Sequence, residues 1–151
     1  MTTTDDKPTF VPDDFDVPQH LDHAPFRLRA LGVEHNERDY AAWTTSVDHI
    51  KATPGFTGES WPHPMSLEAN HGDLAKHAAD FAARRGFTYT VLDTADHVIG
   101  CVYIYPGRDD RHDARVSSWV RVSHAALDQL LYRAVAAWLE AVWPFERVIY
   151  R

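Results

Sequence analysis

The sequence predicts an α+β fold built on a mixed sheet, and three observations predict it. Apolar and polar residues alternate at 26–32 and again at 115–122, which is typical of strands with one buried face. Apolar residues recur at helical spacing in three longer segments. The elements follow one another in the order β-α-α-β-β-β-α-β, and this mixture of helix pairs and hairpins favours an α+β arrangement over a doubly wound one.

The chain divides into an N-terminal extended arm, residues 1–24, and one domain, residues 25–151. The arm is rich in Asp, Pro and Thr, and its prolines exclude a long helix. Its scattered apolar residues predict that part of it lies on the domain surface. The first strand, 26–32, then leads into the domain.

Two helices are expected next. In the first, Asn36 caps the N-terminus and Pro54-Gly55 ends the helix. In the second, Ser66 caps the N-terminus and Gly86 ends the helix. The loop between them carries Trp61.

The second half begins with a hairpin over 87–107, whose second strand is almost wholly apolar and therefore central. The strand 115–122 follows and runs into the most regular helical pattern of the chain, which Pro144 ends. A short closing strand, 146–150, completes a β-α-β unit whose two strands pair in parallel through a right-handed crossover.

Composition narrows the class of protein. The chain has 151 residues, 44% hydrophobic and 25% charged, as expected for one globular domain. Its net charge of −7 makes nucleic acid and anionic membranes poor partners. The single cysteine, Cys101, excludes a disulfide framework, and no signal peptide or membrane span is recognisable. We therefore expect a cytoplasmic protein.

The order of elements, the hairpin "FTYTVLDTADHVIGCVYIYP", the strand "ARVSSWVRV" and the final "LDQLLYRAVAAWLEAVWPFERVIY" together resemble the GNAT acetyltransferase superfamily over residues 25–151. The resemblance implies acetyl transfer from acetyl-CoA to a small amine. It also implies that the strand 115–122 binds the pantetheine arm, and that the following turn holds the pyrophosphate with backbone N–H groups.

That turn departs from the family pattern Q/R-x-x-G-x-G/A, because it contains no glycine. We expect Ser123 to cap the long helix and the N–H groups of His124, Ala125 and Ala126 to point outward. The candidate cofactor-binding residues are Val120, Arg121, Val122, Ser123, His124, Ala125 and Ala126. Two interpretations stay open: an altered CoA site, or a plain helix start.

The C-terminus is a second departure from the family. The chain stops at Arg151, where the resemblance implies a further helix, two strands and a tyrosine that protonates the leaving thiolate. Tyr132 on the long helix is a candidate replacement for that tyrosine. The closing strand is then left with an open edge, which either the arm or a second copy of the chain covers. A homodimer through this edge is one expectation.

Catalysis needs a base for the acceptor ammonium. His77 and Asp80 lie three residues apart on the second helix, so the carboxylate is placed to orient the imidazole. Glu68 on the same helix is a further candidate. An acceptor pocket lined by Trp43, Trp61, Tyr103 and Ser117 is expected.

Other classes are less well supported. The ten histidines show no metal-ligand spacing, so no metal site is predicted. The alternative to a divergent N-acyltransferase is a catalytically inactive GNAT-fold protein that binds a ligand or a partner protein.

Overall fold

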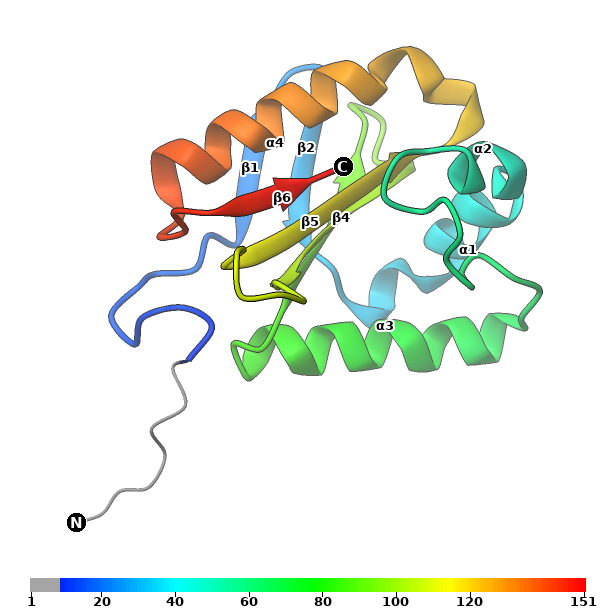
Figure 1. Cartoon of the computed structure of the whole chain (residues 1–151). Helices are drawn as coiled ribbons and strands as arrows, with labels where there is room; N and C mark the ends of the chain where they lie inside the picture. The colour runs from blue at the N-terminus through cyan, green and yellow to red at the C-terminus, as the bar shows by residue number, and fades with distance from the viewer. Residues whose placement is uncertain (1–8) are drawn as a thin grey trace.

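The computed structural model describes residues 9–151, which form one six-stranded sheet with helices on both faces (Figure 1). The strands are β1 (His20–His23), β2 (Phe26–Ala30), β3 (Phe87–Leu92), β4 (Val98–Pro106), β5 (Ala114–Val120) and β6 (Val148–Tyr150). The helices are α1 (Asn36–Thr44), α2 (Val47–Lys51), α3 (Leu67–Ala82) and α4 (Asp128–Val142), with short 3-10 turns η1 (Val33–His35) and η2 (Val122–Leu127). The α+β class and the mixed sheet are therefore confirmed.

The strands lie in sequence order across the sheet. Every neighbouring pair is antiparallel except β5 and β6, which are parallel as the predicted crossover through α4 requires. Helix α4 covers one face, and α1, α2 and α3 cover the other (Figure 1). Each face has its own hydrophobic core, centred on Phe87, Tyr89 and Trp138 under α4 and on Trp43 and Trp119 under α1 and α3.

The predicted arm contains a strand that the sequence pattern did not reveal. Residues 20–23 pair with β2 as an antiparallel hairpin, so the sheet begins before the domain boundary expected at residue 25. Of these four residues only Leu21 is partly buried, and an edge strand with so few apolar positions leaves no alternation to detect.

The rest of the described arm packs on the α4 face. Val11 is buried there, Phe10 stacks on Phe87, and the guanidinium of Arg84 donates to the carbonyl oxygen of Pro12. These contacts are with β3 and the end of α3, and β6 has no strand partner other than β5 in the described residues.

The first predicted helix is in fact two. The hydroxyl groups of Thr44 and Thr45 bond to backbone carbonyls one turn earlier, at Tyr40 and Ala41, and the chain turns at Ser46 before α2 begins. Side-chain hydroxyls that bond to the backbone in this way compete with helix continuation. The buried hydroxyl of Ser46 accepts the N–H of Val122, 2.8 Å away, so this break is tied to the turn that follows β5.

Strand β6 pairs along its whole length with only the first three residues of β5. Their register pairs run only from Ala114↔Val148 to Val116↔Tyr150, whereas β5 continues to Val120. The N–H of Arg121 donates to Ile99 of β4, so alternation directs the amides of Ser118 and Val120 to the other side of β5. In the described chain these two residues have no ladder partner on that side.

We expect Gly100→Ala to destabilise the fold by roughly 2–4 kcal/mol. The added Cβ would overlap the backbone carbonyl oxygen of Trp119 on the paired strand. A matched control is Gly72→Ala in α3, where the added methyl meets nothing within 4 Å. That change should stabilise the protein by about 0.5–1 kcal/mol. Chemical denaturation of both variants measures the difference. Equal stability of the two variants would contradict the close approach of β4 and β5.

Candidate functional site

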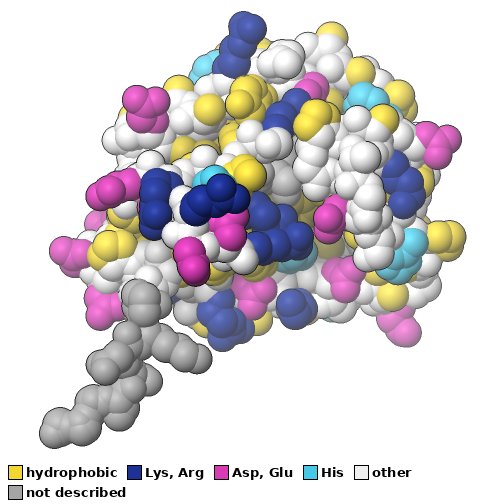
Figure 2. Space-filling view, in the orientation of Figure 1, with side chains coloured by type: hydrophobic (Ala, Val, Ile, Leu, Met, Phe, Trp, Pro, Cys, Tyr) yellow, Lys and Arg dark blue, Asp and Glu magenta, His cyan; other side chains and the backbone are white. Residues whose placement is uncertain are grey.

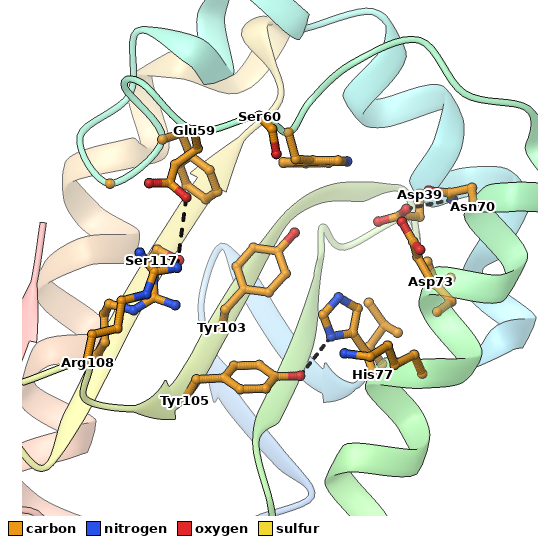
Figure 3. A pocket seen from close by; sticks show the side chains of 17 residues that line it. Asp39, Glu59, Ser60, Asn70, Asp73, His77, Tyr103, Tyr105, Arg108 and Ser117 are labelled. Carbon is orange, nitrogen blue, oxygen red and sulfur yellow. Dashed lines mark hydrogen bonds and ion pairs between the residues drawn. The ribbon is translucent and has the colours of Figure 1, made fainter.

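A cavity of about 410 Å³ opens on the face of the sheet that carries α1 and α3 (Figure 3). Its floor is β4 and β5, through Tyr103, Tyr105 and Ser117. Its sides come from α1, α3, the loop after α2 and the loop between β4 and β5. The residues that line it are Leu31, Asp39, Gly55, Phe56, Glu59, Ser60, Trp61, Asn70, Asp73, Leu74, Lys76, His77, Tyr103, Tyr105, Arg108, Arg115 and Ser117. This size is within the range of small-ligand pockets.

One side of the cavity is acidic. Asp39 of α1 is only 5% exposed, and its Oδ2 accepts a 3.0 Å hydrogen bond from the amide of Asn70. Burial raises the pKa of Asp39 to about 6, opposed by that hydrogen bond and aided by the nearby charge of Asp73. Asp73 lies beside it on the exposed rim of α3 (Figure 3). The carboxyl groups of Asp39 and Asp73 therefore both face the cavity.

Asn70 holds this side of the cavity together. Its Oδ1 accepts from Trp43 Nε1 at 3.0 Å, and its Nδ2 donates to Asn36 Oδ1 and to Asp39 Oδ2. All four side chains are buried. A buried polar group of this kind is stable only when it is fully bonded, so the network fixes the rotamer of Asp39.

A second chain of hydrogen bonds orients His77. Tyr105 donates its only hydroxyl proton to Asp80 Oδ2, 3.0 Å away, and its oxygen lies 2.9 Å from His77 Nδ1. The hydroxyl of Thr88 also lies 3.2 Å from His77 Nδ1. Because the proton of Tyr105 is already used, we assign Nδ1–H as the donor to Tyr105, which leaves Nε2 as the unprotonated nitrogen of the neutral ring. Burial lowers the pKa of His77. The structure thus provides a neutral imidazole, oriented at the cavity wall, with a lone pair on Nε2.

The opposite side of the cavity is basic. Arg115 lies on β5, and Arg108 lies in the loop between β4 and β5 that precedes it. Figure 2 shows basic side chains gathered on this face of the molecule. Arg108 lies 3.9 Å from Glu59. Arg115 has no carboxylate within ion-pair distance among residues 9–151, and its Nε is buried without a hydrogen-bond partner. Burial and the charge of Arg108 both lower the pKa of Arg115.

Most of the expected pocket residues are brought together. Trp61, Tyr103, Ser117 and His77 line the cavity. Trp43 lies beneath the acidic side, fully buried, and acts there through its bond to Asn70.

The residues expected to act in catalysis do not all lie together in the structure. Asp80 contacts Tyr105, not His77 directly, so the predicted pairing across one helical turn is replaced by a tyrosine bridge. Glu68 is exposed and does not line the cavity. Tyr132 is on the other face of the sheet, where its ring packs against Tyr150 at 4.6 Å between centroids. Neither residue is positioned to act in this cavity.

The turn after β5 differs from the expectation in three ways. It forms the 3-10 segment η2, so α4 starts only at Asp128. Ser123 does not cap a helix, because its hydroxyl lies against His124 Nδ1 at 2.9 Å. The amide of His124 is not free either, since it donates to the carbonyl of Arg121. Without glycine the chain closes into a tight 3-10 turn whose later amides bond back within it.

Most of the cavity residues were not found from the sequence, among them Asp39, Asn70, Tyr105 and Arg115. Asp39 matched the acidic first turn of a helix, and Asn70 was one polar residue among many on α3. Tyr105 and Arg115 lie on strands, and the alternation of side chains along a strand places each of them on a definite face of the sheet. Their side of the sheet was therefore predictable, but the proximity of Tyr105 to His77 was not.

No helix in the described part of the chain is long and apolar enough to cross a membrane. In residues 9–151 no three His, Cys, Asp or Glu side chains are grouped closely enough to hold a metal ion.

No protein-family model and no curated protein matches the sequence. Solved structures do match the fold. A ribosomal-protein-S5-alanine acetyltransferase from Vibrio fischeri aligns with a TM-score of 0.67 and 16% identity, over 89% of this chain and 73% of that protein. A ribosomal L7/L12 alpha-N-protein acetyltransferase aligns with a TM-score of 0.66 and 11% identity, over 85% of this chain and 67% of that one.

A third match is the microcin C7 self-immunity acetyltransferase, solved with acetyl-CoA and AMP. It has a TM-score of 0.59 and 9% identity, over 78% of this chain and 62% of that protein. At identities this low the alignments establish the fold, and the chemistry must be argued from the residues of the site. The sheet order, the parallel pairing of β5 with β6 and these alignments together show that this chain has the GNAT fold.

Proposed function

We propose that this protein transfers an acetyl group from acetyl-CoA to a small amine bound in the cavity. The observation that carries the proposal is the position of the cavity on this fold. Ser117 forms part of its floor, and on the same strand the backbone N–H groups of Ser118 and Val120 have no ladder partner among residues 9–151. A thioester lying along that side of β5 would place its carbonyl carbon next to the acceptor cavity.

The cavity residues divide the chemistry between them. Asp39 and Asp73 attract the ammonium form of the acceptor, and His77 Nε2 takes one proton from it. The neutral nitrogen then attacks the thioester carbonyl, the carbon–sulfur bond breaks, and the thiolate leaves as CoA after protonation. The backbone N–H groups at the free edge of β5 are candidates to stabilise the oxyanion. Every proton released in these reaction steps has an acceptor within the site or in solvent.

The cofactor site is proposed along β5 and η2, over Val120–Ala126. Calorimetric titration with acetyl-CoA tests it directly, and a one-site isotherm is expected. Ala125 is exposed on the turn, so Ala125→Trp should abolish binding by steric exclusion, whereas Ala137→Trp on the exposed side of α4 should leave it intact.

The result that overturns this proposal is the absence of acetyl-CoA binding at millimolar concentration. If amines then still raised the melting temperature, the cavity would be the ligand site of a non-catalytic protein. An amine-dependent release of free thiol, followed colorimetrically, is the outcome expected of the enzyme.

The rate should fall in acid. His77 must be neutral, and its pKa is lowered, so it stays unprotonated until the pH drops below its ordinary range. Asp39 must be ionised to hold the ammonium, and its pKa is raised to about 6. We therefore expect kcat/KM to be high above neutrality and to fall as the pH decreases through about 6. A profile that is flat between pH 5 and 8, roughly the range in which these groups titrate, would contradict both assignments.

A further inference from the structure

Two carboxyl groups line one side of the cavity and two arginines line the other, with Lys76 of α3 and Glu59 also in the lining. A pair of arginines is not needed to bind a simple amine. Asp39 and Asp73 lie on the helices α1 and α3, and Arg108 lies at the opposite side of the cavity beside Glu59 (Figure 3). Arg115 of β5 also lines the cavity. Between the two sides the wall is aromatic and aliphatic, through Phe56, Trp61, Tyr103 and Leu74. A ligand that satisfied the whole cavity would have a cation at one end, an apolar middle and an anion at the other end.

Arg115 is the strongest sign of an anionic ligand. It is half-buried, it has no carboxylate partner in the described chain, and its buried Nε makes no hydrogen bond. The other basic group on this side, Arg108, shares Glu59 only at 3.9 Å. A buried guanidinium nitrogen without an acceptor is costly, and a bidentate carboxylate is the group that matches the planar donors of arginine best.

The strand geometry directs Arg115 into the cavity. Arg115, Ser117 and Trp119 alternate along β5 with Val116, Ser118 and Val120, and the first set faces α1 and α3. Arg115 and Ser117 are therefore neighbours on one face. An anion held by Arg115 lies at the end of the cavity away from the carboxylates of α1 and α3.

We propose that the acceptor is an amino acid in the broad sense, a molecule with a primary amine and a carboxylate joined by an apolar spacer. The amine binds at the Asp39 and Asp73 side next to His77, and the carboxylate binds Arg115 with help from Arg108. The part of this inference that is tested by acetylation rates rests on the proposed acyl transfer. The part that is tested by binding affinity depends on ligand binding alone.

A homologous series of probes tests it. Linear α,ω-amino acids from glycine to 8-aminooctanoate are compared with alkylamines and diamines of the same length. Binding is measured by calorimetry without acetyl-CoA, and acetylation is measured by thiol release. We expect one intermediate length of amino acid to bind best, and roughly 10- to 100-fold tighter than the matched alkylamine. The matched diamine, which places a second cation against the arginines, should bind weakest.

The variants locate the effect. Arg115→Gln should lower the ratio of kcat/KM for the amino acid to that for the alkylamine by roughly 10- to 100-fold. Arg115→Glu should reverse the preference toward the diamine. Arg108→Gln, on an exposed loop, gives a smaller change in the same direction if Arg115→Gln fails to fold. Arg111→Gln is the matched control, since Arg111 is exposed in the same loop and does not line the cavity.

The outcomes separate the two proposals. Equal binding of amino acid and alkylamine overturns the zwitterionic acceptor, even if both are acetylated. Tight, Arg115-dependent binding of the amino acid without any acetyl transfer supports the ligand assignment and overturns the enzymatic function. An aminoalkyl phosphonate carries a phosphate-like group in place of the carboxylate. If it binds more than tenfold better than every amino acid, the class of anion proposed here is overturned.

Discussion

His77→Gln is expected to lower kcat for the preferred amine by roughly 10²–10⁴-fold, the usual contribution of a positioned general base. Glutamine fills similar space and retains a hydrogen-bonding group toward Tyr105, but it has no basic nitrogen in place of Nε2. The loss should therefore appear mainly in kcat, with KM changed little. Steady-state kinetics at pH 7.5, roughly where the imidazole is neutral, measures it.

The same helix supplies the control. His71 is exposed on α3 and does not line the cavity, so His71→Gln should retain full activity. Equal rates for the two variants would show that His77 is not the base. Loss of acetyl-CoA binding in His77→Gln would instead indicate a structural defect, and the melting temperature distinguishes that case.

Tyr105 provides an independent check on the same assignment. Tyr105→Phe removes the oxygen that accepts from His77 Nδ1 and separates the ring from Asp80. Tyr105 touches no reacting atom in this proposal, so it is a positioning residue. Its removal should shift the acid limb of the pH profile and lower kcat by less than His77→Gln does. An unchanged pH profile would show that the Tyr105–Asp80 pair does not set the state of His77.

Asn70→Asp is expected to destabilise the fold by roughly 3–5 kcal/mol at pH 8, which is large for an isosteric change. The new carboxylate has no N–H to donate to Asn36 and Asp39, and it puts a second buried negative charge next to Asp39. No cavity is created, so the loss is electrostatic and comes from broken hydrogen bonds. Denaturant unfolding as a function of pH measures it.

The sign of the pH dependence follows from the raised pKa. Asp39 already titrates at about 6 in the folded protein, above its ordinary value of 3.8, and a neighbouring carboxylate raises the pKa further. The folded state then binds more protons than the unfolded state between those values, so stability increases as the pH falls. The destabilisation of Asn70→Asp should therefore be largest at pH 8 and shrink toward about pH 4.

A charge exchange completes this experiment. Asn70→Asp combined with Asp39→Asn restores one amide and one carboxylate to the pair, and it should recover a substantial part of the lost stability at pH 8. Gln129→Glu adds a carboxylate at an exposed position of α4 and is the control for a simple change of net charge. If the double variant is no more stable than Asn70→Asp alone, the two side chains are not coupled as the structure shows.

The sequence predicted the helices and strands that bury an amphipathic face. The long pattern from Leu131 to Leu139 made α4 recognisable, and the apolar run from Val98 marked β4 as central. These patterns are local, because burial of one face imposes a period of 3.6 or 2 on the chain itself. Strand β1 and the break at Ser46 were not predicted. An exposed edge strand produces no alternation of apolar and polar residues, and a hydroxyl that bonds to a distant segment does not change the local sequence pattern.

The candidate site shows the same division. His77, Trp61, Tyr103 and Ser117 were expected at the site from their residue types and elements, and the tertiary structure brings all four to one cavity. Asp39 and Arg115 were not expected, because a carboxylate in a first helical turn and an arginine on a strand are usually solvated.

The order of the elements, their amphipathic faces and the lack of glycine in the turn after β5 can all be read from the amino-acid sequence. Which distant side chains meet depends on how the elements pack. Asp39 and Asn70 are 31 residues apart, and His77 and Tyr105 are 28 apart, yet each pair shares a hydrogen bond. The physical reason is that the pKa of a carboxylate or an imidazole depends on burial and on its bonding partners, and both are set by how α1, α3 and the sheet pack together.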